Sequence, residues 1–132
     1  MKHLSATFKF VLLVFVSVCL QACLPQTTTE RAAVVIFNDT TEVIQYQFML
    51  SNTQTPWANI QKNEFDYAYE YEQDGKIDVL PKELSQVTIM VGGCKVMLSR
   101  SEMENSFIID PEGRNTWNLH VTQKLKDKVR CH

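Results

Sequence analysis

VTIMVGGCKVML, residues 87–98, decides the fold of this chain. On both sides of Gly92-Gly93 the residues alternate with a period of two, which indicates β-strands with one buried face. The two glycines can adopt the positive φ angles of a tight hairpin turn. The stretch therefore predicts two antiparallel strands. Their expected inward residues are Val87, Ile89 and Val91 on the first strand and Cys94, Val96 and Leu98 on the second.

Further strands are expected on both sides of this hairpin. They cover residues 33–37, 42–50, 64–72, 76–80, 107–109 and 117–121, with a short strand or turn at 57–60. About eight short strands separated by regular turn signals are typical of a β-sandwich. We expect one all-β domain over residues 32–132, a small antiparallel β-sandwich of immunoglobulin-like architecture.

Two more hairpins and two polar segments complete this prediction. Asn38-Asp39-Thr40-Thr41 is expected to join strands 33–37 and 42–50, because these side chains favour turns. Asp74-Gly75 is expected to return the chain into a strand over Lys76 to Leu80. A helical turn is expected within residues 99–105. Near the C-terminus, the spacing of two predicts an extended edge strand protected by Lys124, Lys126, Lys128 and Arg130.

The N-terminal sequence has the pattern of an export signal. A positive start with Lys2, His3 and Lys9 precedes an apolar run, Phe10 to Leu20, which is too short to span a bilayer. Leu20-Gln21-Ala22-Cys23 follows. This junction resembles the lipobox of bacterial lipoproteins. The resemblance implies that residues 1–22 are a cleaved lipoprotein signal peptide and that Cys23 is lipidated.

The same resemblance implies where the protein resides. Leu24, rather than Asp, follows the cysteine, which implies the periplasmic leaflet of the outer membrane. Three acyl chains, palmitate among them, would be an effectively permanent anchor. Residues 23–31, polar after the cysteine, would form a short tether. The alternative is an ordinary signal peptide, which would leave a soluble periplasmic or secreted protein.

Cys94 and Cys131 are the remaining pair of cysteines in the exported chain. An even pair in an oxidising compartment predicts a disulfide. Closing this loop would contribute roughly 4 kcal/mol in the chain-entropy model. The rival interpretation, a metal pair of Cys131 and His132, lacks the further ligands that zinc or copper needs. We therefore expect neither a metal nor another cofactor.

Composition and motifs argue against two classes of function. The formal net charge is −2, and removal of Lys2 and Lys9 makes the exported chain more acidic, which disfavours nucleic-acid binding. The sequence has no Gly-x-Ser-x-Gly, phosphate-binding glycine loop or His-Glu-x-x-His motif. His120 stands between the expected core residues Leu119 and Val121, so it should face solvent rather than act as a base. We expect a protein without catalytic residues.

The run EFDYAYEYE, residues 64–72, is the candidate binding feature. Strict alternation would place Phe65, Tyr67, Tyr69 and Tyr71 on one face and Glu64, Asp66, Glu70 and Glu72 on the other. In one interpretation the aromatic face covers the core, with Phe65 buried and a tyrosine near the rim. In the other it is a recognition strip, and its acidic row favours a basic partner. The candidate partner-binding residues are Tyr67, Tyr69, Tyr71, Glu70 and Glu72.

These features together favour a membrane-anchored, non-enzymatic lipoprotein. Its sandwich would be a protein-interaction or accessory module of the bacterial cell envelope. It would bind the membrane through its lipid anchor and a protein partner through the strip, and no nucleic acid. The alternative is an immunity or inhibitor lipoprotein that neutralises a periplasmic toxin or hydrolase. An enzyme, such as an envelope hydrolase, is the third hypothesis.

Overall fold

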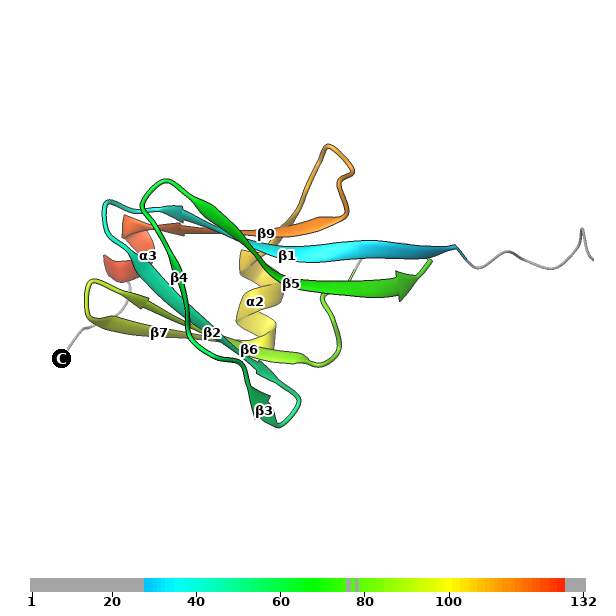
Figure 1. Ribbon diagram of the computed structural model, residues 1–132, viewed down its shortest axis with the longest axis horizontal. Helices are drawn as coiled ribbons and strands as arrows, with labels where there is room; N and C mark the ends of the chain where they lie inside the picture. Colours follow the sequence, from blue (N-terminus) through cyan, green and yellow to red (C-terminus); the bar gives the residue numbers. More distant parts are fainter. Residues whose placement is uncertain (1–27, 76, 78, 128–132) are drawn as a thin grey trace, which may run out of the picture.

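The computed structural model describes residues 28–75, 77 and 79–127, which form a sandwich of two β-sheets (Figure 1). Sheet A contains β1 (Thr29–Asp39), β5 (Phe65–Asp74), β8 (Ile108–Ile109) and β9 (Thr116–Thr122). Sheet B contains β2 (Ile44–Leu50), β3 (Thr53–Gln54), β4 (Ala58–Ile60), β6 (Leu84–Val91) and β7 (Cys94–Ser99). The predicted all-β sandwich is confirmed.

Strand β1 lies inside sheet A, whose order is β5-β1-β9-β8. It pairs antiparallel with β5 and parallel with β9. The predicted antiparallel architecture therefore includes one parallel pair. Residues 32–36 are all buried, as expected for a strand covered on both faces. The strand begins at Thr29, so it includes the last three residues of the predicted tether, 29–31.

Sheet B has the order β3-β2-β6-β7, and β4 also pairs with β2. The hairpin of β6 and β7 is confirmed in register, with Val91 opposite Cys94. Gly92 and Gly93 have φ angles of 53° and 78°. Both values lie in the left-handed region that favours glycine, which explains why the turn needs these two residues.

The core lies between the two sheets, and inward strand residues form most of it. Sheet B contributes Ile44, Tyr46, Phe48, Val87, Ile89, Val91, Val96 and Leu98, and sheet A contributes Val34, Ile36, Trp117, Leu119 and Val121. All of them are at most 7% exposed. Regular alternation therefore predicted the inward face correctly in β6, β7 and β9.

The predicted hairpin of residues 33–37 with 42–50 is wrong, because β1 and β2 belong to different sheets. The cause is Asn38, whose side chain is fully buried where the chain crosses between the sheets. Its Nδ2 donates to the carbonyl oxygens of Glu42, Ile60 and Gln61 at 2.8–3.0 Å. Its Oδ1 accepts from the backbone N–H of Thr40 at 3.0 Å. The turn chemistry was predicted correctly, but it supports a crossing between sheets.

The predicted return strand over Lys76 to Leu80 is also wrong, since the described residues of this stretch form no strand. The end of β5 already pairs with the start of β1, Asp74 lying opposite Thr29. The chain then passes to sheet B and buries Ile77 and Leu80 in the core. The guanidinium of Arg100 holds this passage by donating to the carbonyls of Leu80, Pro81 and Leu84.

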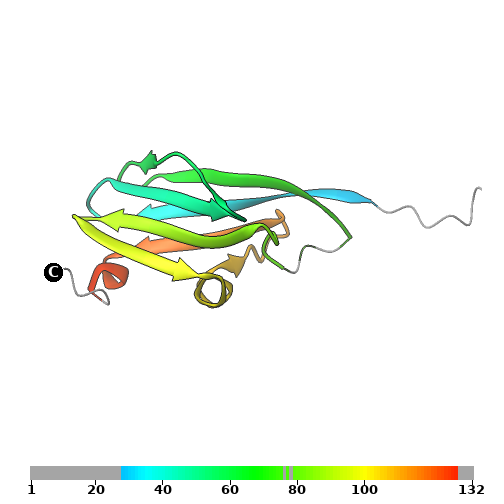
Figure 2. The same ribbon diagram turned by 90° about the horizontal axis from the view of Figure 1, so that it is seen from below.

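Two short helices lie on the same side of the sandwich (Figure 2). Helix α2 (Arg100–Ser106) confirms the predicted helical turn and contacts β6 and β7. It begins with a capping box, in which Ser99 donates its backbone N–H and its hydroxyl to Glu102 at 2.8 and 2.7 Å. Met103 is the buried residue of α2.

Helix α3 (Gln123–Asp127) replaces the start of the edge strand predicted near the C-terminus. Lys124 is therefore helical, and Leu125 packs against the core. The helix thus lies against the core through Leu125 and contacts β7 and β9. Lys126 belongs to the same helix, whereas Lys128 and Arg130 lie outside the described residues.

The predicted disulfide joins one described residue to one that is not described. Cys94 begins β7 and is 5% exposed, whereas Cys131 lies outside the described residues. Helix α3, the last described element, contacts β7. The pairing stays a prediction, which non-reducing peptide mapping of periplasm-derived protein would test.

Candidate protein-interaction surface

An irregularity in β5 determines which of its aromatic side chains are accessible. In the register with β1, Tyr69 lies opposite Val34 and Tyr67 lies opposite Val35. Ala68 is therefore an extra residue without a partner of its own, which defines a β-bulge. A bulge shifts the alternation by one position, so the side chains before and after it exchange faces.

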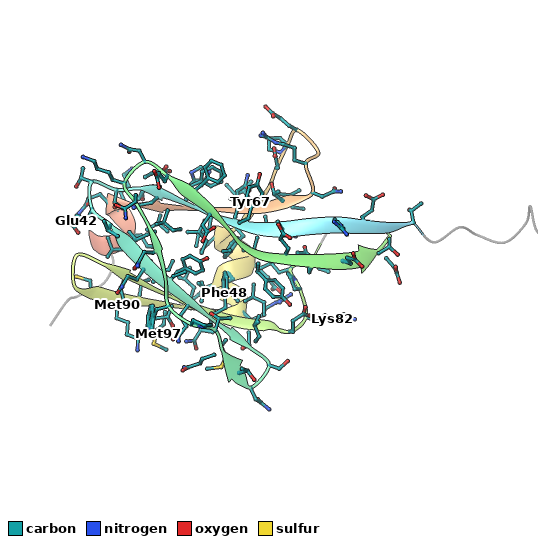
Figure 3. All side chains as sticks on the ribbon, viewed as in Figure 1. Glu42, Phe48, Tyr67, Lys82, Met90 and Met97 are labelled. Atoms are coloured by element: carbon teal, nitrogen blue, oxygen red, sulfur yellow. The ribbon has the colours of Figure 1, made fainter. Side chains whose placement is uncertain are left out.

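The bulge divides the aromatic run between the two faces of sheet A. Tyr69 and Tyr71, after the bulge, pack against the core. Phe65 and Tyr67, before it, are 53% and 57% exposed. Figure 3 shows Phe48 between the sheets and Tyr67 at the outer surface of sheet A. The predictions of one aromatic face and of a buried Phe65 are wrong, because both assumed a regular strand.

Asp66 also lies on a different face from the one predicted. Its Oδ2 accepts a hydrogen bond of 2.7 Å from the hydroxyl of Tyr46, a core residue of sheet B. Burial and this carboxylate raise the pKa of Tyr46. An inward charge beside a sheet edge disfavours further strand pairing. Asp66 therefore links the two sheets. It does not belong to an acidic row on the outer face of sheet A, contrary to the prediction from sequence.

The two inward tyrosines are anchored differently. Tyr69 meets Phe48 edge-on at a centroid distance of 6.4 Å and donates to Glu83 at 2.8 Å. Burial and then this carboxylate raise the pKa of Tyr69 to about 12. Burial also raises the pKa of Tyr71, and the indole N–H of Trp117 opposes that rise. Tyr69 and Tyr71 stack at 6.2 Å and are partly buried against the core.

The outer face of sheet A carries an aromatic row formed by Tyr67, Phe65, Phe37 and His120. Successive ring centroids in this order lie 5.8, 5.4 and 4.5 Å apart. Phe37 and His120 are parallel to within 7°. His120 faces solvent as predicted, and its Nδ1 lies 2.7 Å from Oδ2 of Asp39. The row thus presents ring faces and edges on three adjacent strands.

Two neighbouring hollows share Tyr67 as a lining residue. The larger has a volume of about 490 Å³ and is lined by Arg31, Ala32, Ala33, Tyr67, Glu70, Tyr71, Glu72, Arg114 and Thr116. The smaller has a volume of about 170 Å³ and is lined by Val35, Phe37, Phe65, Tyr67, Asp110, Arg114, Thr116 and Asn118. Tyr67, Arg114 and Thr116 line both hollows, so the two hollows adjoin each other.

The charges beside the hollows are unequally paired. Nε of Arg31 lies 3.4 Å from Glu72. Arg114 lies 2.5 Å from Asp110 and 2.9 Å from Glu112, and its hydrogen bond keeps the pKa of Asp110 below its usual range. Among the described residues, the carboxylate of Glu70 has no ion pair or hydrogen bond. The surface therefore has an unneutralised negative charge at Glu70.

The structure brings together only some of the residues predicted for binding. Tyr67, Glu70 and Glu72 line the outer face of sheet A, whereas Tyr69 and Tyr71 mainly serve the core. Sequence reasoning missed Phe37, Arg114 and Asn118, which come from segments remote from β5. Phe37 had one signal, because it continues the outward series of Ala33 and Val35. Cys23 lies outside the described residues.

Metal centres and membrane-spanning helices are both absent from the described part of the chain. No group of three or more His, Cys, Asp or Glu residues there is arranged to hold a metal ion. No helix of that part is long and apolar enough to cross a membrane. Comparison with family models, with curated proteins and with solved structures finds no match.

Proposed function

We propose that this protein is a lipid-anchored lipoprotein of the bacterial cell envelope that acts as a non-enzymatic protein-interaction module. Its partner binds the outer face of sheet A. The observation that carries this proposal is the exposure of Phe65 and Tyr67 beside Phe37 and His120. Aromatic residues are enriched in protein interfaces, and contiguous exposed apolar surface commonly marks a binding site.

The position of the anchor supports the accessibility of this face. The chain between Cys23 and the start of β1 at Thr29 reaches at most about 20 Å, so that end of β1 would stay near the membrane. The start of β1 and the end of β5 project together beyond the other strands, at the right of Figure 1. Phe37 lies about 26 Å further along β1, from the usual rise per residue. The aromatic row would then face the periplasm away from the lipid.

The anchor has its own test. Metabolic labelling with an alkyne fatty acid should mark the wild-type protein and not Cys23→Ser. Equal labelling of both proteins would contradict lipidation at Cys23. That result would leave the binding surface to be tested separately.

The binding surface is tested by photo-crosslinking in cells. A photoreactive phenylalanine analogue replaces Tyr67, and a matched control replaces Met97, which is 53% exposed on sheet B. The proposal predicts a discrete protein adduct at position 67 and none of that mass at position 97. Absence of an adduct at 67, or the same adduct at both positions, would contradict it. An exported toxin or hydrolase as the adduct would identify the alternative, an inhibitor or immunity lipoprotein.

A further inference from the structure

We infer that the outer face of sheet A binds an extended segment of a partner protein that carries a basic residue and a tyrosine two positions apart. This inference rests on the proposed function and names the chemistry of its partner. It depends on the different chemistry of the two neighbouring hollows that Tyr67 lines. One offers a free carboxylate beside an aromatic ring, and the other offers aromatic walls around an unpaired acceptor.

The larger hollow suits a lysine or arginine side chain. Glu70 lines it without a partner among the described residues. Arg31 is engaged by Glu72, and Arg114 is engaged by Asp110 and Glu112. The hollow itself is lined by two carboxylates and two guanidinium groups, but both guanidinium groups already have carboxylate partners and Glu70 has none. A cation placed beside Glu70 would also meet the ring of Tyr67, which adds a cation–π attraction.

The smaller hollow suits an aromatic side chain with a hydrogen-bond donor. Phe37, Phe65 and Tyr67 line it, and Val35 contributes apolar surface. Asn118 also lines it, and the Oδ1 atom of Asn118 is buried and makes no hydrogen bond to any described residue. A buried acceptor without a donor is costly. A tyrosine hydroxyl entering the hollow would supply that donor.

The spacing of the hollows matches an extended chain. Ala33 lines the larger hollow and Val35 lines the smaller one. Side chains two positions apart on a strand point to the same face and lie about 7 Å apart. A partner segment laid along β1 in an extended conformation therefore presents residues i and i+2 to the two hollows. The sequence pattern is Lys/Arg-x-Tyr, or its reverse if the segment runs in the opposite direction.

The test uses full-length protein in detergent and fluorescent pentapeptides. The probes are acetyl-Ser-Lys-Ser-Tyr-Ser-amide, its reverse, and versions with Glu for Lys or Gly for Tyr. Fluorescence polarisation should show that either the Lys-Ser-Tyr peptide or its reverse binds the protein. Replacing Lys by Glu in that peptide should lower its affinity about tenfold, since rim charges steer and select partners. Glu70→Lys should produce a similar loss. Glu64→Lys, an equal charge change beside β5 that lines neither hollow, should change affinity by less than about twofold.

A second variant tests the tyrosine hollow. Replacing Tyr by Phe in the peptide should weaken its binding to the wild-type protein. The Asn118→Leu protein should bind the Tyr peptide and the Phe peptide with equal affinity. Equal binding of Lys and Glu peptides, or an unchanged preference for Tyr in Asn118→Leu, would overturn the inference. So would an adduct at position 67 that is a second copy of this chain. If no peptide binds but position 67 yields an adduct with another protein, this inference fails and the proposed function stands.

Discussion

Phe65 and Tyr67 at the start of β5 are exposed, whereas Tyr69 and Tyr71 further along the same strand pack on the core. The two halves have similar composition and belong to one alternating run. They differ because Ala68 is bulged, which reverses the faces of all residues on one side of it. A single extra residue thus gives one strand a core-forming half and a half available for binding.

The largest expected effect is a difference in stability between the two halves. Tyr71→Ala should lower the free energy of unfolding by about 2 to 3 kcal/mol, because it removes a ring packed against the core. Tyr67→Ala should lower it by less than about 0.5 kcal/mol, as for an exposed side chain. Urea denaturation followed by circular dichroism measures both. Equal losses in the two variants would mean that the bulge does not divide the strand.

Deleting Ala68 should have an intermediate effect. Removal of the extra residue leaves a regular strand in which Tyr67 faces outward and Tyr69 faces inward, as both do now. We expect a loss of about 1 kcal/mol, because Ala68 itself packs against the core. Hydroxyl-radical footprinting should still modify Tyr67 far more than Tyr71. Protection of Tyr67 in this variant would show that the faces are set by something other than the bulge.

The smallest expected effect concerns pH. Burial and the Glu83 carboxylate raise the pKa of Tyr69 in the folded protein to about 12, above the ordinary tyrosine value of 10.0. The stability from this neutral hydroxyl is therefore complete below about pH 10 and is lost as the pH rises towards 12. Between about pH 10 and pH 12, the free energy of unfolding of Tyr69→Phe should fall less than that of the wild type. Urea denaturation at a series of pH values measures both. Parallel curves for the two proteins would argue against this hydrogen bond.

The sequence predicted regular segments well for a physical reason. In residues 87–98, alternation and the two glycines are local features, and each decides its own part of the hairpin. The bulge at Ala68 depends instead on how β5 matches Val34 and Val35 of β1, which no local pattern records. The sequence gives only a weak sign of the bulge, which is that Ala68 interrupts the acidic row of residues 64–72.

The connections between strands were predicted less well, because distant residues decide them. Asn38 has the chemistry of a turn, but its acceptors include the carbonyls of Ile60 and Gln61, far along the chain. The passage after Gly75 depends on Arg100. The candidate surface likewise needed Phe37 and Asn118 from other strands. Tyr67, Glu70 and Glu72 were predicted because they belong to one recognisable run.

The most direct test of the account asks whether Phe65 serves binding rather than folding. Phe65→Ala is combined with the photo-crosslinker at position 67, and its stability is measured in parallel by urea denaturation. The account predicts loss of the partner adduct with a change in unfolding free energy below about 1 kcal/mol. Met97→Ala, equally exposed on the other sheet, should retain the adduct. An adduct that persists in Phe65→Ala, or destabilisation as large as that of Tyr71→Ala, would contradict the account.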